Sequence, residues 1–555
     1  MLNYERYKRV PVLNYPERQW PGNEIKKAPV WCSVDLRDGN QALTEPMVVE
    51  EKIEMFHLLV KLGFKEIEVG FPAASQIEFD FLRQLVERKL IPDDVVIQVL
   101  VQCREHLVKR TFEALKGVKK AIVHIYNSTS TLQREVVFHK DMDEIKAIAV
   151  QGAQWVKQYM KDFDGEVVLE YSPESFTGTE LEFALDICTA VQETWGAAPD
   201  KKIIFNLPST VEMTTPNVYA DQIEWMNTHF KDRDSIILSV HPHNDRGTGI
   251  AAAELALLAG AQRVEGTLLG NGERTGNLDI LTVAYNMFSQ GINPELHLEN
   301  IREIIDVYER CTKMEVGPRH PYAGKLVFTA FSGSHQDAIN KGLKAMKDRK
   351  NPYWEVPYLP IDPADIGRQY EPVVRINSQS GKGGVAFVMD TFYGFKLPKG
   401  MHKEFADVIQ AISEKQGEVA PEQILDEFKS NYTDKKEPIH FLKAQITEAE
   451  EDVEFSTLVK VRYSDHGVEK IFEGVGNGPI DAVQKGLEKE LDIEIRVLDY
   501  YEHALTSGSG AKAASYIHLL DVKSGKATYG VGISSNITRA SIRGIFSAVN
   551  RLFYS

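Results

Sequence analysis

The sequence predicts an α/β protein whose largest domain is a closed (β/α)8 barrel of the TIM type. Strand-like apolar runs alternate with helical patterns eight times between residues 30 and 288, and such alternation implies a parallel sheet. Eight units in about 260 residues match the usual size of a closed barrel. A doubly wound open sheet is the alternative, but no G-x-G-x-x-G motif follows the first strand, which disfavours it.

The individual elements of this barrel follow from the periodicity of apolar residues. Apolar runs predict strands at 30–36, 66–71, 95–101, 120–126, 166–171, 202–206, 235–240 and 263–269. Apolar residues that recur on one helical face predict helices near 46–61, 79–85, 106–115, 142–163, 180–194, 218–229 and 250–259, with a last one ending near 288. A single apolar face is what a helix on the outside of a barrel needs.

Three further domains are predicted around the barrel domain, which spans residues 30–305. Residues 1–29 are rich in proline, tyrosine and charge and predict an N-terminal arm, and residues 306–436 predict helical linker subdomains. Residues 437–555 contain an internal repeat in which strand-like runs lead to Gly-Val-Gly and then to a helix. This repeat predicts an α+β regulatory module with pseudo-twofold symmetry, whose role is ligand sensing or dimerisation.

Composition excludes several classes of function. The net charge of −16 over 555 residues argues against nucleic-acid binding, which needs a basic face. The four cysteines are far apart and form no C-x-x-C motif, which fits a reducing compartment. Neither a signal peptide nor an apolar run of membrane-spanning length is evident. We therefore expect a cytoplasmic protein with no membrane partner.

Two histidines two residues apart end the seventh predicted strand. Alternate side chains of a strand point to one face, so His241 and His243 project together, and neutral imidazole is the commonest metal ligand. An isolated pair of this kind is also typical of a polar surface turn. However, Asp38 and Asn277 follow the first and the eighth strand, and the carboxyl ends of barrel strands meet at one face. The four side chains together predict a divalent-metal site with oxygen and nitrogen ligands.

Other polar residues are expected at the same face. Arg37 adjoins Asp38 and is suited to stabilise a developing oxyanion or enolate. Glu174, His335 and Tyr358 are the candidates for proton transfer, although each taken singly is equally explained as a hydrogen-bonded structural residue. Gln41 after the first strand and His124, Ser172 and Thr210 on or after later strands add further polar side chains there, and we expect this group to bind the substrate.

Several stretches resemble a known family. Residues 36–41, 239–245 and 272–277 look like the three signatures of the metal-dependent acyl-CoA Claisen-condensing barrels. Residues 171–176, 331–338 and 356–358 extend the match to the 2-isopropylmalate synthase family, in its long form with a C-terminal leucine-sensing domain. The resemblance covers nearly the whole chain, and its motifs are specific in combination and weak singly.

The resemblance implies an acyltransferase that condenses acetyl-CoA with 3-methyl-2-oxobutanoate and water to give (2S)-2-isopropylmalate and CoA. This is the first committed step of leucine biosynthesis, and leucine is expected to inhibit it. A divalent metal is implied, with Mg²⁺ expected and Mn²⁺ or Zn²⁺ as alternatives. Related homocitrate and citramalate enzymes share the barrel signatures, so the choice of oxo acid depends on the longer matches and the domain layout.

The resemblance also implies roles for single residues. Asp38, His241, His243 and Asn277 match metal positions, Arg37 matches the arginine that polarises the keto oxygen, and Thr210 matches a contact of the oxo-acid carboxylate. Glu174, His335 and Tyr358 match the acid/base set, within which the base for acetyl-CoA stays open. His335 and Tyr358 are implied to reach the barrel of the other subunit of a homodimer. The implied leucine-site residues are Asn477, Gly478, Pro479, Ile480 and Tyr500.

Two other functions compete with this one. A lyase or carboxyl-transfer barrel would share the metal site, but the repeat domain and the stretches around His335 and Tyr358 argue against it. A non-catalytic amino-acid sensor would use only the C-terminal module. It would require a degenerate barrel site, whereas all four metal positions and Arg37 are intact.

Overall fold

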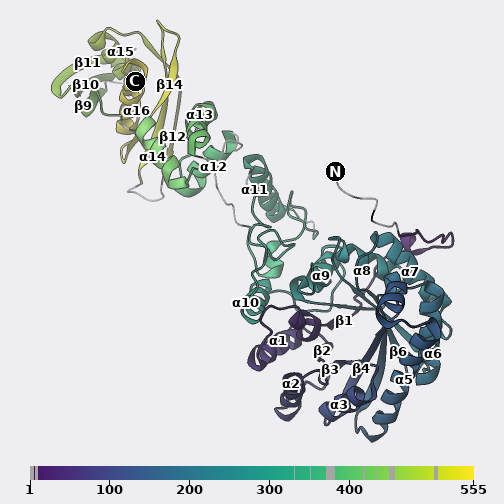
Figure 1. The fold of residues 1–555 in the computed structure, drawn as a ribbon. Helices are drawn as coiled ribbons and strands as arrows, with labels where there is room; N and C mark the ends of the chain where they lie inside the picture. Colours follow the sequence, from purple (N-terminus) through teal and green to yellow (C-terminus); the bar gives the residue numbers. More distant parts are fainter. Residues whose placement is uncertain are drawn as a thin grey trace. The chain divides into compact units, whose positions relative to one another are not determined.

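The structure, a computed structural model, divides into two compact units (Figure 1). It describes residues 6, 10–330, 332–349, 352–370, 382–416, 419–433, 435–448, 457–505 and 511–554. The first unit takes in Met1–Phe328 and Ile361–Gln369, and the second takes in Thr329–Pro360 and Tyr370–Ser555. Among the described residues, none of the helices combines the length and the apolar character needed to cross a membrane.

The first unit contains a closed barrel of eight parallel strands in chain order, which confirms the predicted fold. The barrel closes where β1 pairs with β8, with Cys32 opposite Glu265. The strands are β1 (Val30–Ser33), β2 (Glu66–Gly70), β3 (Val96–Gln102), β4 (Lys120–Ser128), β5 (Glu166–Glu174), β6 (Ile203–Ser209), β7 (Ile236–Pro242) and β8 (Arg263–Gly266).

Helices surround these strands (Figure 1). Local capping defines several of their starts, as where Ser75 accepts a hydrogen bond from the backbone N–H of Glu78 and where Asp141 and Glu144 form a capping box. The helices of this unit are α1 (Val49–Lys61), α2 (Gln76–Glu87), α3 (Glu105–Leu115), α4 (Thr131–Gln133), α5 (Met142–Tyr159), α6 (Leu181–Trp195), α7 (Pro216–His229), α8 (Gly249–Leu258), α9 (Ile280–Ser289) and α10 (Ile301–Thr312).

The first and last strands are shorter than predicted. The strand predicted at 30–36 ends at Ser33, because Asp35–Gly39 forms the π-helical turn η3. The strand predicted at 263–269 ends at Gly266, since Leu268–Gly270 turns and Leu269 has a φ of 58°. Conversely, β4, β5 and β6 run two or three residues further than their apolar runs, because their polar side chains are paired inside the barrel instead of ending the strand.

The N-terminal segment is tied to the barrel by α7. The indole Nε1 of Trp20 donates to Asp221 at 2.8 Å, and the backbone N–H of Gln19 donates to both oxygens of Glu224 at 3.1 and 2.9 Å. The described part of the predicted arm is therefore packed on the barrel.

In its described residues, the second unit begins with four helices and ends in two small sheets. The helices are α11 (Gly333–Asp348), α12 (Lys382–Tyr393), α13 (Lys399–Gln416) and α14 (Pro421–Tyr432). Their aromatic rings pack closely, with Phe405 and Phe428 5.4 Å apart and Phe428 and Tyr432 5.8 Å apart. The same apolar cluster includes Tyr516 and Val531 from the second sheet, so helices and sheet share a core.

The C-terminal repeat consists of two β–β–β–α units. The first contains β9 (Ile439–Glu448), β10 (Thr457–Asp465), β11 (Val468–Gly476) and α15 (Pro479–Leu491). The second contains β12 (Ile495–Ala504), β13 (Ala513–Asp521), β14 (Ala527–Ser534) and α16 (Ile537–Phe553). Both sheets are antiparallel. The predicted pseudo-twofold module is thus present, with a third strand in each half that the sequence analysis did not separate.

The two Gly-Val-Gly motifs lie inside these third strands instead of between a strand and a helix. A Cβ at Gly474 would lie 2.0 Å from the carbonyl oxygen of Ala482, and one at Gly532 would lie 2.0 Å from that of Ala540. Only glycine allows α15 and α16 to approach their strands this closely. The repeated Gly-Val-Gly motif is therefore explained by the close packing of each helix on its strand.

Candidate functional site

Most of the residues predicted for the barrel site line one cavity of about 230 Å³, although Asn277 is not part of its lining. The lining set comes from the carboxyl ends and inner faces of seven strands and their loops. It contains Arg37, Asp38, Gln41, Leu100, His124, Tyr126, Ser172, Glu174, Asn206, Pro208, Thr210, His241, His243, Glu273 and Arg274. Sequence analysis thus predicted most of the polar lining, including Gln41, which is exposed at the site.

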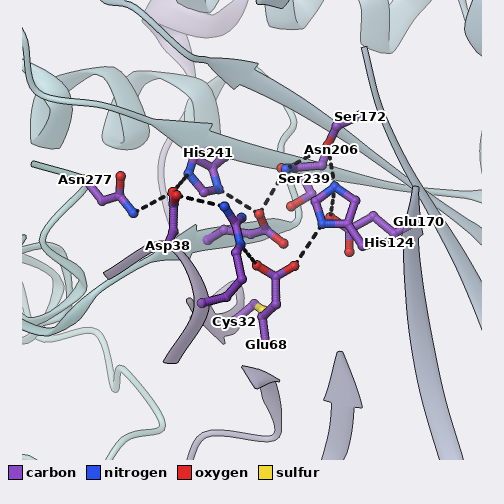
Figure 2. A network of polar contacts seen from close by, with 12 residues as sticks. Cys32, Asp38, Glu68, His124, Glu170, Ser172, Asn206, Ser239, His241 and Asn277 are labelled. Carbon is purple, nitrogen blue, oxygen red and sulfur yellow. Dashed lines mark hydrogen bonds and ion pairs between the residues drawn. The ribbon is translucent and has the colours of Figure 1, made fainter. Parts of the chain in front are cut away.

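Three of the four predicted metal ligands form a compact group. Ligand atoms of Asp38, His241 and His243 all lie within 4.8 Å of one another, and all three residues are buried. The Nε2 atoms of His241 and His243 lie 3.1 and 3.9 Å from Asp38 Oδ2. Figure 2 shows Asp38 between His241 and Asn277. Two imidazoles and a carboxylate fit a divalent metal with mixed nitrogen and oxygen ligands.

Asn277 contacts the same carboxylate through its nitrogen. Its Nδ2 donates to Asp38 Oδ2 at 2.9 Å, while its Oδ1 and the Nδ1 of His243 are buried without a hydrogen-bond partner. Buried polar atoms are rarely left without one. Two orphaned acceptors next to a buried carboxylate fit a cation. An oxygen ligand from Asn277 requires the amide to be turned over, which interchanges its nearly isosteric oxygen and nitrogen.

The three candidate ligands differ in their electrostatic environment. Burial opposes ionisation of Asp38, but Arg37 and His241 outweigh it and hold the pKa of Asp38 well below its usual range. Burial and the neighbouring His241 lower the pKa of His243 to about 3, so its ring is a free electron-pair donor at neutral pH. Hydrogen bonds to Asp38 and Glu265 overcome burial and raise the pKa of His241 to about 9. A metal cation at Nε2 therefore takes the place of a proton.

Arg37 is held between two carboxylates. Its Nη1 lies 2.7 Å from Asp38 Oδ1, and its Nε donates to Glu68 Oε1. Although burial opposes its charge, these carboxylates keep the pKa of Arg37 above its ordinary value. The guanidinium is thus a fixed cation at the cavity beside the candidate metal ligands.

The inner wall of the cavity is a chain of hydrogen bonds. His124 lies in the middle of β4, where its Nδ1–H donates to Glu68 Oε2 at 2.9 Å and its Nε2 accepts from Ser172 Oγ at 2.7 Å. Because Glu68 can only accept, it determines which ring nitrogen of His124 carries the proton. Asn206 Nδ2 donates to Ser172 Oγ at 3.2 Å.

The rim of the cavity is built from loops. Glu174 ends β5 and accepts a hydrogen bond from Ser128. Thr210 Oγ1 accepts from the backbone N–H of Ser175 at 2.9 Å, and the carbonyl oxygen of Thr210 accepts from Arg274 Nη2 at 2.5 Å. The predicted proton-transfer group and the predicted carboxylate contact therefore lie on the same side of the cavity.

Sequence analysis missed the charged layer beneath the cavity. Arg263 Nη1 and His241 Nδ1–H each donate to Glu265 at 2.8 Å, and all three residues are buried, as is Glu170. The signal was available in the sequence, because Arg263, Glu265 and Glu170 interrupt apolar strand runs. Inward-facing charges in a barrel strand require partners inside the barrel.

His335 and Tyr358 lie outside the unit that carries the barrel. Their rings stack with centroids 4.1 Å apart, and both side chains are exposed. Tyr358 has a φ of 65°, which is uncommon for a bulky residue. The structure therefore brings these two predicted residues together with each other.

The predicted leucine-site residues belong to both repeats of the second unit. Asn477 and Gly478 form the turn between β11 and α15, Pro479 and Ile480 begin α15, and the backbone N–H of Asn477 donates to Asp481 at 2.9 Å. Tyr500 lies on β12 and is 3.4 Å from Ser541 Oγ on α16.

Known protein families match the chain in three consecutive segments. A family described as HMGL-like matches residues 28–307. An alpha-isopropylmalate synthase post-catalytic domain-like family matches 325–390, and a LeuA allosteric (dimerisation) domain family matches 418–553. Fold and site together thus define an HMGL-like barrel enzyme with a cluster that fits a divalent metal, followed by a regulatory domain.

Curated relatives make the assignment more specific. The 2-isopropylmalate synthase of Clostridium acetobutylicum is 56% identical over 99% of both chains. Those of Rhizobium johnstonii and Agrobacterium fabrum are 55% and 53% identical over 99% of this chain and 98% of theirs. The chain belongs to the 2-isopropylmalate synthase family, which confirms the resemblance.

Proposed function

We propose that this chain condenses acetyl-CoA with 3-methyl-2-oxobutanoate and water, giving (2S)-2-isopropylmalate and CoA. The observation that carries the proposal is the buried group of Asp38, His241 and His243, with Arg37 beside it, in a chain of this family. A Claisen condensation needs a polarised keto group and a base for the acetyl methyl group. The cavity offers a cation for the first and a carboxylate, Glu174, for the second.

Asp38, His241, His243 and the side-chain oxygen of Asn277 would hold the divalent metal. When bound, such a metal supplies Lewis-acid polarisation of a keto oxygen and orients the oxo acid. Mg²⁺ is our proposal for the ion, with Mn²⁺ and Zn²⁺ as alternatives that the same donors accept.

Arg37 stabilises the negative charge that develops on the keto oxygen, since its position between Asp38 and Glu68 is set before substrate arrives. Thr210 contacts the oxo-acid carboxylate. Gln41, His124 and Ser172 line the remaining cavity and bind substrate. Glu174, His335 and Tyr358 form the acid/base set, and the base for acetyl-CoA is one of these three.

The domain layout extends the proposal to regulation. Residues 1–29 form an arm, 30–305 the barrel domain, 306–436 the linker subdomains and 437–555 a leucine-binding regulatory domain. The family match of residues 418–553 supports dimerisation and allosteric control through this last domain. We propose a homodimer in which His335 and Tyr358 serve the partner's barrel, and a leucine site that includes Asn477, Gly478, Pro479, Ile480 and Tyr500.

A rate comparison across 2-oxo acids tests the activity. Free CoA is followed with a thiol reagent while the metal-loaded protein receives acetyl-CoA and a 2-oxo acid of increasing chain length. The highest kcat/KM is expected with 3-methyl-2-oxobutanoate, and D38A is expected to abolish turnover while leucine binding is retained. Absence of CoA release with every short 2-oxo acid would refute the proposal.

A leucine titration of the same reaction tests the regulation. The full chain is expected to lose activity as leucine rises, and N477A is expected to need more leucine for the same loss. K489A, a substitution at the far end of α15, is the matched control. Equal leucine sensitivity of N477A and the control would remove Asn477 from the site.

A further inference from the structure

Two fully buried carboxyl groups face each other beneath the metal cluster. Glu170 lies on β5 and Glu265 on β8, and oxygens of both lie within 4.8 Å of each other and of a ring nitrogen of His124. Both residues have zero exposure. Figure 2 shows Glu170 beside His124, on the side away from Asn277. The activity proposed above gives Glu170 no role.

The hydrogen-bond partners of Glu265 are those of an anion. Its Oε1 accepts from Gln98 Nε2 at 2.9 Å and from Arg263 Nη1 at 2.8 Å. Its Oε2 accepts from Asn206 Nδ2 at 2.9 Å and from His241 Nδ1–H at 2.8 Å. Each of these four groups is a donor and none is an acceptor, so Glu265 has the surroundings of an ionised carboxylate.

Glu170 has the opposite environment, because neither of its oxygens receives a hydrogen bond. Arg263 Nη2 is 3.4 Å away without forming a hydrogen bond to Glu170, and it donates to Gln98 Oε1 at 2.6 Å instead. His124 Nε2 is 3.6 Å away and already accepts from Ser172. An ionised carboxylate without donors in a dry interior is costly, and such groups keep their proton instead.

Charge repulsion supports the same distribution of protons. Two carboxyl groups in contact cannot both ionise in a buried site. Burial raises the pKa of Glu170 well above its usual range, and Glu265 and Glu68 add to the rise against the opposing charge of Arg263. As an acid, Glu170 can donate to Glu265.

We propose that Glu170 is a positioning residue of the metal centre: held as a neutral acid, it donates to Glu265 and keeps Glu265 as the ionised acceptor of His241 Nδ1–H. The proposal rests on the proposed function in one respect, namely that His241 binds the metal. A hydrogen bond at Nδ1 leaves the Nε2 lone pair for the metal and orients the ring. Glu170 thereby acts on the metal through two other residues and touches neither metal nor substrate.

The opposite protonation state would make a different site. If Glu170 were ionised, then Glu170, Glu265 and His124 would form a second group of ligands that could hold a cation of its own. The two possibilities differ in an isosteric substitution. Glutamine keeps the shape of glutamic acid, a hydrogen-bond donor and zero charge, whereas alanine removes the donor and leaves a void.

Metal binding to the full-length protein distinguishes them. Mn²⁺ titrated into the metal-free wild type, E170Q and E170A, and followed by electron paramagnetic resonance, gives Kd and stoichiometry without any turnover. We expect one tight site per chain, a Kd in E170Q within about threefold of the wild type, and a Kd in E170A weaker by roughly 10- to 100-fold. Equal weakening in E170Q and E170A, or no weakening in E170A, would overturn the proposal. So would a second tight Mn²⁺ in the wild type that E170Q loses.

Infrared spectroscopy detects the proton on Glu170 directly, and it is informative even if E170A does not fold. The carbonyl stretch of protonated carboxylic acids is expected in the wild type at neutral pH, where buried Asp35 also contributes to it, and the component from Glu170 is expected to be missing in E170Q. The control E66Q alters a carboxylate that accepts from Arg263 Nε at 2.5 Å, and should retain the band. A spectrum of E170Q that keeps the whole wild-type band overturns the proposal. Failure of CoA release would refute the proposed activity and leave these readings unaffected.

Discussion

Asp35 allows a quantitative test of how burial and hydrogen bonding compete in this barrel. It starts the turn η3 and is 3% exposed. Its carboxylate accepts from Ser33 Oγ at 2.7 Å and from the backbone N–H of Leu268 at 3.0 and 3.2 Å. Burial outweighs these hydrogen bonds and raises the pKa of Asp35 from 3.8 to about 7.

The sign of the effect on stability follows from this shift. Below about pH 4 the carboxyl is protonated in both the folded and the unfolded chain, so its burial does not lower the free energy of unfolding through ionisation. Between about pH 4 and pH 7 the unfolded chain releases the proton while the folded chain retains it, so the free energy of unfolding falls. A shift of this size corresponds to a loss of roughly 4 kcal/mol, complete above about pH 7.

The substitution D35N removes this dependence and preserves the contacts. The amide oxygen can accept from Leu268, and the amide nitrogen can donate to Ser33 Oγ, since a hydroxyl also accepts. We expect the unfolding free energy of D35N to rise relative to the wild type by up to about 4 kcal/mol between pH 4 and pH 8. Urea unfolding followed by tryptophan fluorescence measures it, because Trp31 and Trp195 are buried in the barrel unit.

A surface aspartate is the matched control for this experiment. Asp94 is exposed, and its hydrogen bond with Lys65 lowers its pKa. Its effect on the free energy of unfolding therefore has the opposite sign: any stabilisation by the ionised carboxylate is present at neutral pH and is lost as the pH falls. D94N is therefore expected to show a weak trend in the other direction. A difference between D35N and the wild type that stays constant from pH 4 to pH 8 would refute the reasoning.

Three further predictions concern the cavity. R37K loses the planar fork that joins two carboxylates, and we expect kcat for CoA release to fall by about 10² to 10³; an unchanged kcat would exclude Arg37 from oxyanion stabilisation. G276A puts a Cβ 2.0 Å from a backbone carbonyl oxygen at a φ of +105°. It should weaken Mn²⁺ binding by displacing Asn277, whereas G291A, at a φ of +77° with nothing within 4 Å, should not; equal affinities would contradict this. Divalent metal at 100 times its Kd should raise the unfolding free energy of the wild type by about 2.7 kcal/mol, and H243A should respond little; an equal response would place the metal elsewhere.

Much of the barrel could be predicted because its information is local. Apolar runs and helical periodicity depend on neighbours in the chain, so the order and type of the eight strand–helix units were confirmed. The predicted ends of strands were less accurate where a contact with a distant part of the chain ends the strand. The run before Asp35 continues past Ser33, but the chain turns there because Asp35 binds the backbone of Leu268, more than two hundred residues away.

The group of candidate metal ligands could be predicted for a related reason. His241 and His243 share a strand face, and Asp38 and Asn277 follow other strands of a barrel whose strand ends must meet. The buried layer below them was not predicted. Arg263, Glu265 and Glu170 interrupt apolar strand runs, but the sequence does not show which of them pair, because pairing depends on their orientation on β8 and β5.

The sequence by itself determined the family, the order of the domains and the chemical types gathered at the carboxyl face of the barrel. These features depend on composition, spacing and motifs, all of which are visible in the linear sequence. Tertiary structure alone decided which nitrogen of His124 carries its proton, that Arg37 is held between Asp38 and Glu68, and that Glu265 supports His241 from below. The physical reason is that pKa values and hydrogen-bond directions depend on distances of a few ångströms between strands, which the linear order of residues does not contain.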